Sequence, residues 1–374
     1  MARIVRALAT CALAIGPAGA IAPQQSIGRW LLDAALSSPL YKAVLVPQAK
    51  RTMVDTAESN GVRWRESLDW IQRQGPWELP AKETIVEPPE YYRQPFHAYE
   101  EGNLCWEAAW EGEIASRAVG ARNFPQYGPE GETAFRGAFD EALGSLGGTV
   151  PKDGVIVDLG CGTGVSTRRL AQNFPEARSV LGLDLSPHFI TVGRKLLDLG
   201  NTAEPKGWVN KLERESRVTL RCADAGKTGL EDASCDVVVL SLVIHELPPD
   251  ATMDISAEAL RILKPGGQLW VTEMDFETPA FSKLRANPLL FSLIRSTEPY
   301  LDVYADWQPQ FPMELRALGF ETVSLAAATG RHFALVATKA MLGAKDRKEG
   351  IDDRRKDTAK EDTHLKTWES KSKA

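Results

Sequence analysis

Cysteines are few in the 374-residue sequence, and none is arranged to hold a metal. The five cysteines form no C-x-x-C pair, and no cysteine–histidine set has the spacing of zinc ligands. Cys11 lies near the start of the chain, apart from Cys105, Cys161, Cys222 and Cys235. The last three fall in a glycine loop or border apolar runs, which is typical of buried thiols. We therefore expect neither a metal site nor a disulfide framework.

Basic clusters and long apolar runs are also missing from the body of the chain. The formal net charge is −6, and no basic cluster stands out in the part expected to fold. Because nucleic-acid binding relies on Lys and Arg to neutralise phosphates, we expect no nucleic-acid partner. No segment is long and apolar enough for a stable membrane span. The sequence does not indicate an oligomeric state.

The first 22 residues have the order of a targeting segment. Arg3 and Arg6 precede an apolar run over 7–15, and the small residues at 18–20 resemble a signal-peptide cleavage site. An unprocessed N-terminal helix is the alternative, since short apolar runs are ambiguous. The rest of the chain shows no disulfide pattern. A cleaved signal or transit peptide ahead of such a chain favours import into a reducing organelle. We expect a plastid (chloroplast) location, with the secretory pathway as the alternative.

Helical periodicity dominates between this leader and residue 130. Apolar residues spaced three and four apart run over 28–74, and a second helical stretch covers about 100–119. Prolines break the chain between them, at Pro76, Pro80, Pro88 and Pro89. The sequence thus predicts a helical extension and lid over 23–130, a ligand-binding α/β domain over 131–340 and a disordered charged tail over 341–374.

From residue 154 onward, short β-branched runs alternate with helical stretches. Five near-continuous apolar runs lie at 155–157, 179–183, 218–220, 236–240 and 268–272. Such runs separated by helices are typical of a parallel sheet covered on both faces. Two further runs, at 322–326 and 332–338, are close enough to pair antiparallel. We expect an α/β fold, a doubly wound, mostly parallel, seven-stranded Rossmann-like sheet with an antiparallel edge strand.

A glycine-rich loop directly follows the first strand of that sheet. It runs from Asp158 through Gly160, Cys161 and Gly162 to Gly164, where a helix begins. Glycines let the backbone turn sharply and approach a ligand, and the free amides of the helix start suit an anionic group. The D-x-G-x-G-x-G order departs from the G-x-G-x-x-G of nicotinamide sites, because Val165 stands where the last glycine belongs.

Acidic residues end the next two predicted strands. Asp184 follows the second strand about twenty residues after the glycine loop, where a carboxylate can accept both ribose hydroxyls of an adenosine ligand. Asp224 ends the third strand, where a carboxylate can accept from an adenine amino group. A structural glycine turn with ordinary surface acids is the alternative interpretation, and it is stronger for Asp224 alone than for the set.

In this order, these features resemble the class I S-adenosylmethionine-dependent methyltransferases, over roughly 132–339. The resemblance implies that the glycine loop holds the methionine moiety, Asp184 the ribose and Asp224 the adenine of S-adenosyl-L-methionine. The candidate cofactor-binding residues are Asp158, Gly160, Cys161, Gly162, Gly164, Asp184, Leu185, Asp224, Ala225 and Ser241. The N-terminal region and the stretch His-Glu-Leu-Pro at 245–248 look similar to type 11 and quinone-biosynthesis methyltransferases of chloroplasts and photosynthetic microbes.

His245 is the candidate general base, because it follows the fourth strand and lies on the side where ligands bind in such sheets. An imidazole can accept a proton near neutrality, and Glu246 could orient it. A role in capping the next helix is the alternative for His245. Glu246 itself is interpreted as a pairing or capping residue. Methyl transfer can also proceed without a base, by alignment of the acceptor, the methyl group and the sulfur alone. A general base at this position would therefore indicate an oxygen or carbon acceptor.

The segment 91–100 is dense in aromatic and polar residues and could close over the cofactor as a lid. Tyr92, His97 and Tyr99 are candidate acceptor-site groups, with a packed helix start as the alternative for each. The long stretch 276–318 carries several aromatics and could form a roof over a partly apolar acceptor. A plain core helix is the alternative there.

The sequence therefore predicts an enzyme that transfers a methyl group from S-adenosylmethionine to a small, amphipathic or aromatic acceptor, with O- or C-methylation favoured. One alternative is a protein or RNA methyltransferase, which would need a basic groove or an added recognition domain. The other is a methyltransferase-like scaffold without turnover, which the intact glycines and acids disfavour. A nicotinamide oxidoreductase is disfavoured by the glycine spacing.

Overall fold

The computed structural model describes residues 39–80, 86–97, 99–200, 215–287, 291, 294, 297–341 and 350–355. The predicted leader over 1–22, and with it the predicted plastid location, lies outside the described residues. So does most of the predicted charged tail. In the described part, no helix is long and apolar enough to cross a membrane.

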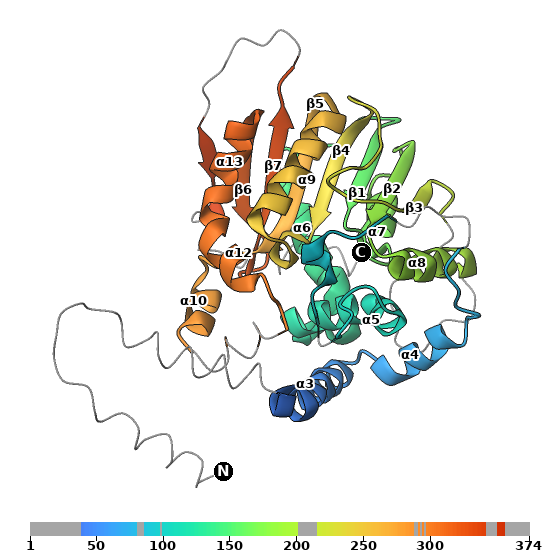
Figure 1. The fold of residues 1–374 in the computed structure, drawn as a ribbon. Helices are drawn as coiled ribbons and strands as arrows, with labels where there is room; N and C mark the ends of the chain where they lie inside the picture. Colours follow the sequence, from blue (N-terminus) through green and yellow to red (C-terminus); the bar gives the residue numbers. More distant parts are fainter. Residues whose placement is uncertain are drawn as a thin grey trace, which may run out of the picture.

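A single mixed sheet forms the centre of the molecule, in the order β3-β2-β1-β4-β5-β7-β6-β8 (Figure 1). Strands β1 to β5 pair in parallel, and β7 runs antiparallel to both β5 and β6. The strands are β1 Val155–Leu159, β2 Ser179–Asp184, β3 Val218–Cys222, β4 Cys235–Ser241, β5 Leu263–Met274, β6 Phe320–Ala327, β7 His332–Lys339 and β8 Ile351–Asp353.

Helices cover both faces of the sheet, which explains why its strands are apolar on both sides. One face packs Val157, Val238 and Val271 against helices α9, α12 and α13. The other packs Ile156 and Val239 against helices α6, α7 and α8. These helices are α6 Gly131–Ser145, α7 Val165–Asn173, α8 Pro187–Leu199, α9 Pro249–Ile262, α12 Leu301–Trp307 and α13 Phe311–Leu318. The predicted doubly wound α/β fold is confirmed.

Two details of the predicted sheet are wrong. The antiparallel strand β7 lies inside the sheet, between β5 and β6, and not at its edge. The sheet has eight strands where seven were expected, because residues 351–353 of the predicted disordered tail pair in parallel with β6. Arg355 just beyond this strand forms ion pairs with Asp275 and Glu277, which ties the described piece of the tail to the end of β5.

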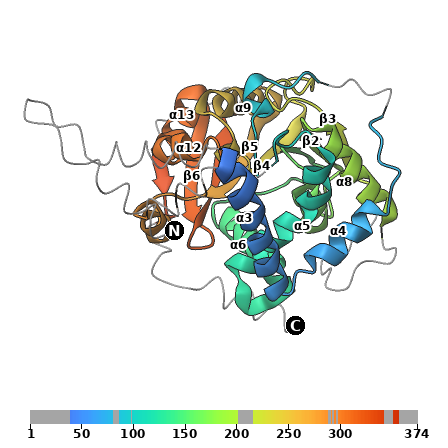
Figure 2. The same cartoon turned by 60° about the horizontal axis from the view of Figure 1, so that its bottom comes forward.

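The N-terminal helices gather at one end of the sheet, where they form a core of their own (Figures 1 and 2). They are α3 Pro39–Ser59, α4 Trp64–Gln72 and α5 Trp106–Asn123. Trp64, Ile71 and Ile114 are buried there, and the cluster includes Leu196 of α8. The remaining short helices are η1 Glu90–Arg93, η2 Pro125–Glu130, η3 Ile244–Glu246, α10 Pro279–Arg285 and η4 Gln308–Gln310.

Candidate active site

The strand order reverses its direction between β1 and β4. From β1 the chain continues on one side to β2 and β3, and on the other side β1 pairs with β4. Adjacent parallel strands whose connections run in opposite directions leave a ligand crevice at their carboxyl ends. The glycine loop, Asp184, Asp224 and the 241–247 turn all follow strands of this group, so they meet at one edge.

The glycine loop takes backbone conformations that only glycine adopts without strain. Gly160, Gly162 and Gly164 have φ angles of 72°, 56° and 87°. A Cβ on Gly160 would lie 2.8 Å from the Val243 side chain, so the loop touches the turn after β4. A Cβ on Gly162 would meet no described atom within 4 Å. The loop therefore presents bare backbone to free space.

Asp184 is fixed at the tip of β2 by backbone amides. Its carboxylate accepts from the amides of Gly162 and Ser186, both at 2.8 Å. The Tyr92 hydroxyl, from the segment before α5, lies 3.4 Å from Oδ1 of the same carboxylate. Burial raises the pKa of Asp184, and these hydrogen bonds oppose the rise. The acid and the glycine loop thus form one unit.

Asp158 is fully buried at the end of β1. Its Oδ2 accepts from the hydroxyls of Ser166 and Thr167 at 2.7 and 2.6 Å, whereas Oδ1 has no partner among the described residues. Burial raises the pKa of Asp158 to about 6, and the two hydroxyls oppose the rise. An unsatisfied buried carboxylate oxygen is costly, and a donor from a ligand or a water would offset that cost.

Asp224 lies at the tip of β3, the third strand along this edge. Its Oδ1 accepts from the Gly226 amide at 2.8 Å. Burial raises the pKa of Tyr91, and the nearby charge of Asp224 raises it further. Tyr91 and Tyr92 are consecutive in η1, so this short helix faces the tips of both β2 and β3. Ala225 is half-buried beside Asp224, and Leu185 and Cys161 are buried. The predicted roles of these residues in binding the cofactor stay predictions.

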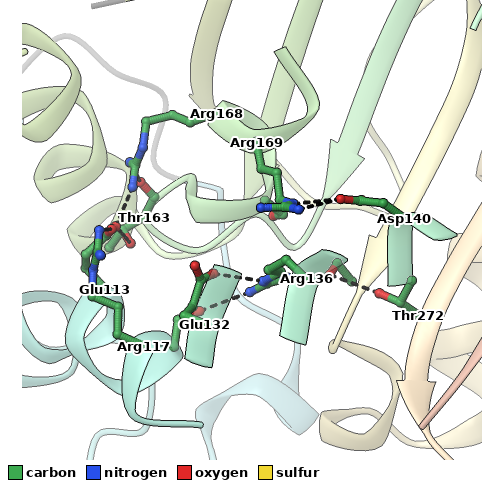
Figure 3. Close-up of polar contacts among 12 residues, drawn as sticks. Glu113, Arg117, Glu132, Arg136, Asp140, Thr163, Arg168, Arg169 and Thr272 are labelled. Carbon is green, nitrogen blue, oxygen red and sulfur yellow. Dashed lines mark hydrogen bonds and ion pairs between the residues drawn. The ribbon is translucent and has the colours of Figure 1, made fainter. Parts of the chain in front are cut away.

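A buried ion-pair network holds the glycine loop against the N-terminal helices (Figure 3). Glu113 of α5 pairs with Arg117 at 2.9 Å and with Arg168 of α7 at 2.6 Å. Arg168 also donates to the carbonyl of Thr163 within the loop, at 3.2 Å. Burial opposes ionisation of Glu113, but the two guanidinium groups outweigh it and lower its pKa. The extension thereby helps to shape the loop.

A second polar network reaches the tips of β4 and β5 (Figure 3). Arg136 of α6 pairs with Glu132 and donates to the Ser241 hydroxyl at 2.8 Å. Thr272 donates to the same hydroxyl at 3.1 Å, and Arg136 also reaches Ser116 of α5 at 3.0 Å. Ser241 therefore contacts this network, and its predicted role in cofactor binding stays a prediction.

His245 is paired with a carboxylate that sequence reasoning missed. Its Nδ1 lies 2.8 Å from Glu273, which is fully buried at the end of β5. Nε2 lies 4.0 Å from Glu246. Burial opposes protonation of His245, but Glu273 and then Glu246 and Glu298 outweigh it and raise its pKa to about 10. His245 is therefore an imidazolium at neutral pH, with Nδ1–H donating to Glu273.

A small pocket of about 20 Å³ that opens to solvent lies beside this pair. Its apolar and aromatic walls are Tyr91, Tyr92, Phe96, Leu247, Pro299 and Tyr300. Its polar lining is Gln94, Asn103 and Glu246. In the part of the chain that the structure describes, His245, His97 and Tyr99 are not among the lining residues. Small-molecule sites have this mixture of apolar walls and a few polar groups.

His97 and Tyr99 lie in different surroundings. His97 has a left-handed φ of 50°, and its Nε2 lies 3.0 Å from Glu298 near the pocket. Burial opposes protonation of His97, but Glu298 and then Glu246 raise its pKa. The Tyr99 hydroxyl instead donates to Glu111 of α5 and lies 3.5 Å from Lys50 of α3. The structure thus brings His97 toward His245 and leaves Tyr99 among the N-terminal helices.

The comparisons with known proteins agree with this geometry. Residues 157–271 match a family model described as a methyltransferase domain. That range contains the glycine loop, Asp184, Asp224 and His245. Over these residues the chain is similar to methyltransferase domains.

Curated relatives match over about a third to a half of this chain. An arsenite methyltransferase from Aquipseudomonas alcaligenes is 33% identical over 136 residues, which cover 36% of this chain and 37% of that protein. A demethylmenaquinone methyltransferase from Clavibacter sepedonicus is 29% identical over 184 residues, 45% of this chain and 66% of that protein. The chain thus aligns with little more than a third of the first relative and two thirds of the second.

A solved structure of an S-adenosylmethionine-dependent methyltransferase from Aquifex aeolicus also aligns with the chain. Its TM-score is 0.40 at 16% identity, over 58% of this chain and 97% of that one.

Four functional candidates that the sequence analysis did not name lie outside the matched range 157–271. They are Glu273, Glu298, Asn103 and Arg136. Glu273 had a usable signal, because it is a charged residue at the end of an apolar strand, as Asp184 and Asp224 are. The other three were not found because their contacts with site residues are distant in sequence: Arg136 with Ser241, Asn103 with Glu246 and Glu298 with His97.

Cys105, Cys161, Cys222 and Cys235 are free thiols, and all but Cys105 are buried. Within the described ranges, no group of three or more His, Cys, Asp or Glu side chains could hold a metal ion.

Proposed function

We propose that this protein transfers the methyl group of S-adenosylmethionine to a small-molecule acceptor, with an oxygen or carbon acceptor favoured. The observation that carries the proposal is the unit formed by Asp184 and Gly162, in which a fixed carboxylate lies beside bare backbone and free space. In this proposal the glycine loop holds the methionine moiety, Asp184 the ribose and Asp224 the adenine. The sulfonium of the bound cofactor supplies the electrophilic methyl group.

The residues of the chain would act mainly by positioning. Gly162 lets the ligand approach the backbone closely, because a Cβ there would meet no described atom within 4 Å, and Asp184 accepts from hydroxyls. Tyr92 contacts Asp184 at the tip of β2 and would help to shield the reacting atoms from water. Alignment of the acceptor with the methyl group then supplies a large share of the rate.

The acceptor pocket supports an aromatic or amphipathic substrate. Six of the nine lining residues are aromatic or apolar, and the other three, Gln94, Asn103 and Glu246, are polar. The curated relatives carry names with chemically different acceptors, such as arsenite, demethylmenaquinone and malonyl-[acyl-carrier protein]. Their names therefore do not select one acceptor, and the proposal rests on the pocket.

Calorimetry with S-adenosylhomocysteine, with S-adenosylmethionine and with NAD tests the cofactor assignment. We expect the first two to bind in the micromolar range and NAD to show no saturable heat. In Asp184→Ala, the affinity for S-adenosylhomocysteine should fall by about 100-fold, because hydrogen bonds to a charged group are lost. Equal binding by the variant and the wild type would contradict the ribose assignment. A protein that binds the cofactor but turns over no acceptor would be a scaffold.

A further inference from the structure

The acceptor pocket contains one carboxyl group in its described lining, that of Glu246 in η3. We propose that Glu246 takes the proton from a hydroxyl on an aromatic acceptor, and that His245 positions this carboxylate and does not accept the proton itself. The inference rests on the proposed methyl transfer and names the acceptor class and the base for it.

Geometry places Glu246 toward the pocket and His245 behind it. Glu246 lines the pocket together with Tyr92 and Asn103, whose amide lies 3.5 Å from its Oε2. Asn103 in turn accepts from the Ser186 hydroxyl through its backbone carbonyl at 2.6 Å, next to Asp184. Glu246 is therefore connected to the cofactor side of the crevice through a short chain of contacts.

His245 is already occupied by Glu273. The Glu273 carboxylate accepts from the Met274 amide at 2.7 Å and lies 3.3 Å from the His245 amide. These bonds fix Glu273, which in turn holds Nδ1 of the imidazole at 2.8 Å. A protonated imidazole in such a pair has no lone pair for a substrate proton. Its Nε2–H side, 4.0 Å from Glu246, stabilises the Glu246 carboxylate by charge.

The other titratable groups of the pocket cannot accept a proton. Burial, with neighbouring carboxylates, raises the pKa of Tyr91 to about 12 and raises that of Tyr92 well above its ordinary value. Burial also raises the pKa of Tyr300. All three phenols are neutral and donate hydrogen bonds. They form the aromatic walls, and Glu246 is left as the acceptor of protons.

The charges around Glu246 come from four elements. His245 belongs to η3 itself, Glu273 to the end of β5, His97 to the segment before α5, and Glu298 to the segment before α12. Burial is the largest contribution and raises the pKa of Glu246. His97 and His245 lower this pKa, whereas Glu298 and Glu273 raise it, and the net result is a pKa of about 7. A group with that pKa is half ionised at neutral pH, which suits general base catalysis.

The chemical step balances with these residues. The Glu246 carboxylate takes the proton of the acceptor O–H as the oxygen lone pair forms a bond to the methyl carbon, and the carbon–sulfur bond breaks with its electrons going to sulfur. Glu246 then returns the proton to solvent through the open side of the pocket.

A chromogenic phenol, 4-nitrocatechol, tests the inference in the full-length protein. Its phenolate absorbance is followed against pH, with saturating S-adenosylhomocysteine, in the wild type, Glu246→Gln, His245→Gln and Asp250→Asn. Asp250 is an exposed carboxyl four residues from Glu246 and serves as the matched control. S-adenosylhomocysteine affinity is measured first in each, and methyl transfer to the same phenol afterwards.

We expect the wild type and Asp250→Asn to bind the phenol and to ionise it in a step at lower pH than the step of the free phenol. Glu246→Gln should keep its S-adenosylhomocysteine affinity, lose that step and lose methyl transfer by about 100-fold or more. His245→Gln should still ionise the phenol, with the step moved to higher pH, because a positive neighbour is gone.

Two results would overturn the inference. In the first, Glu246→Gln ionises the phenol as the wild type does while His245→Gln does not, which would make His245 the base. In the second, the wild type binds S-adenosylhomocysteine but produces no saturable phenol signal, which would exclude a hydroxyaryl acceptor. A wild type that fails to bind S-adenosylhomocysteine would instead contradict the proposed function, so the two failures are distinguishable.

Discussion

The molecule contains two clusters of buried charge that differ in balance. Behind the glycine loop, the carboxylate of Glu113 meets two guanidinium groups, and its pKa is lowered although it is fully buried. Beside the acceptor pocket, two histidines face three glutamates, and the pKa of Glu246 is raised to about 7. Glu298 in the second cluster also keeps one carboxylate oxygen without a partner among the described residues.

The difference in charge balance indicates that the two clusters have different roles. A buried charge with matched partners fixes a local conformation, and its removal leaves those partners uncompensated. A buried carboxyl with surplus negative neighbours titrates near neutrality, which is typical of groups that exchange protons with a ligand. We therefore assign the first cluster to the shape of the cofactor loop and the second to acceptor chemistry.

The largest effect is expected when the matched cluster is broken. Glu113→Gln removes the charge that pairs with Arg117 and Arg168, so it should lower the free energy of unfolding by about 3 kcal/mol or more. Urea denaturation at neutral pH measures this change. S-adenosylhomocysteine affinity should also fall, because Arg168 holds the Thr163 carbonyl of the loop.

An exposed ion pair provides the control for Glu113. Asp69 and Arg73 of α4 pair at 2.5 Å, with side chains 62% and 67% exposed. Asp69→Asn should change the free energy of unfolding by no more than about 0.5 kcal/mol, because exposed pairs contribute little. If the two variants lowered the free energy of unfolding by the same amount, burial would not explain the strength of the Glu113 network.

A smaller, pH-dependent effect is expected in the unbalanced cluster. The folded protein keeps a proton on Glu246 up to about pH 7, whereas the unfolded chain loses it near the ordinary glutamate value. The stability of the wild type should fall as pH rises between these values and then level off, and Glu246→Gln should not show this loss.

Thermal or urea unfolding at several pH values tests this expectation. The stability of Glu246→Gln relative to the wild type should grow by up to about 3 kcal/mol between pH values near 4 and near 8. A constant difference across that range would mean that the pKa of Glu246 is ordinary in the folded protein. The comparison between the two clusters would then lose its basis.

The smallest effect is expected at Tyr92, which connects the pocket to the cofactor side. Its hydroxyl lies 3.4 Å from the carboxylate that we assign to the ribose. If the ribose replaces this contact, Tyr92→Phe should bind S-adenosylhomocysteine more tightly, by less than about 10-fold. Weaker binding, measured by calorimetry, would show that the hydroxyl contacts the cofactor directly.

The cofactor side was predictable because its signals are local. The glycine loop is contiguous, and Asp184 and Asp224 each end an apolar strand, so the rule of strand tips in parallel sheets finds them. The same rule applied to β5 would also have found Glu273. The alternation of strands and helices was sufficient to predict the sheet, apart from the position of β7 inside it and the presence of β8.

The acceptor side depends on contacts that no local pattern records. His245 was predicted as a base from its own neighbours, but its pairing partner Glu273 lies 28 residues away. Glu298 meets His97 across about two hundred residues of sequence. Strand β8 has three residues in a charged tail, and only its pairing with β6 distinguishes it from its surroundings.

Hydrogen–deuterium exchange with and without S-adenosylhomocysteine tests most directly the claim that three strand tips bind one ligand. We expect the ligand to protect peptides covering 158–165, 184–187 and 222–227 together, at one common concentration midpoint. Protection limited to one of these segments, or found only elsewhere in the chain, would contradict the account.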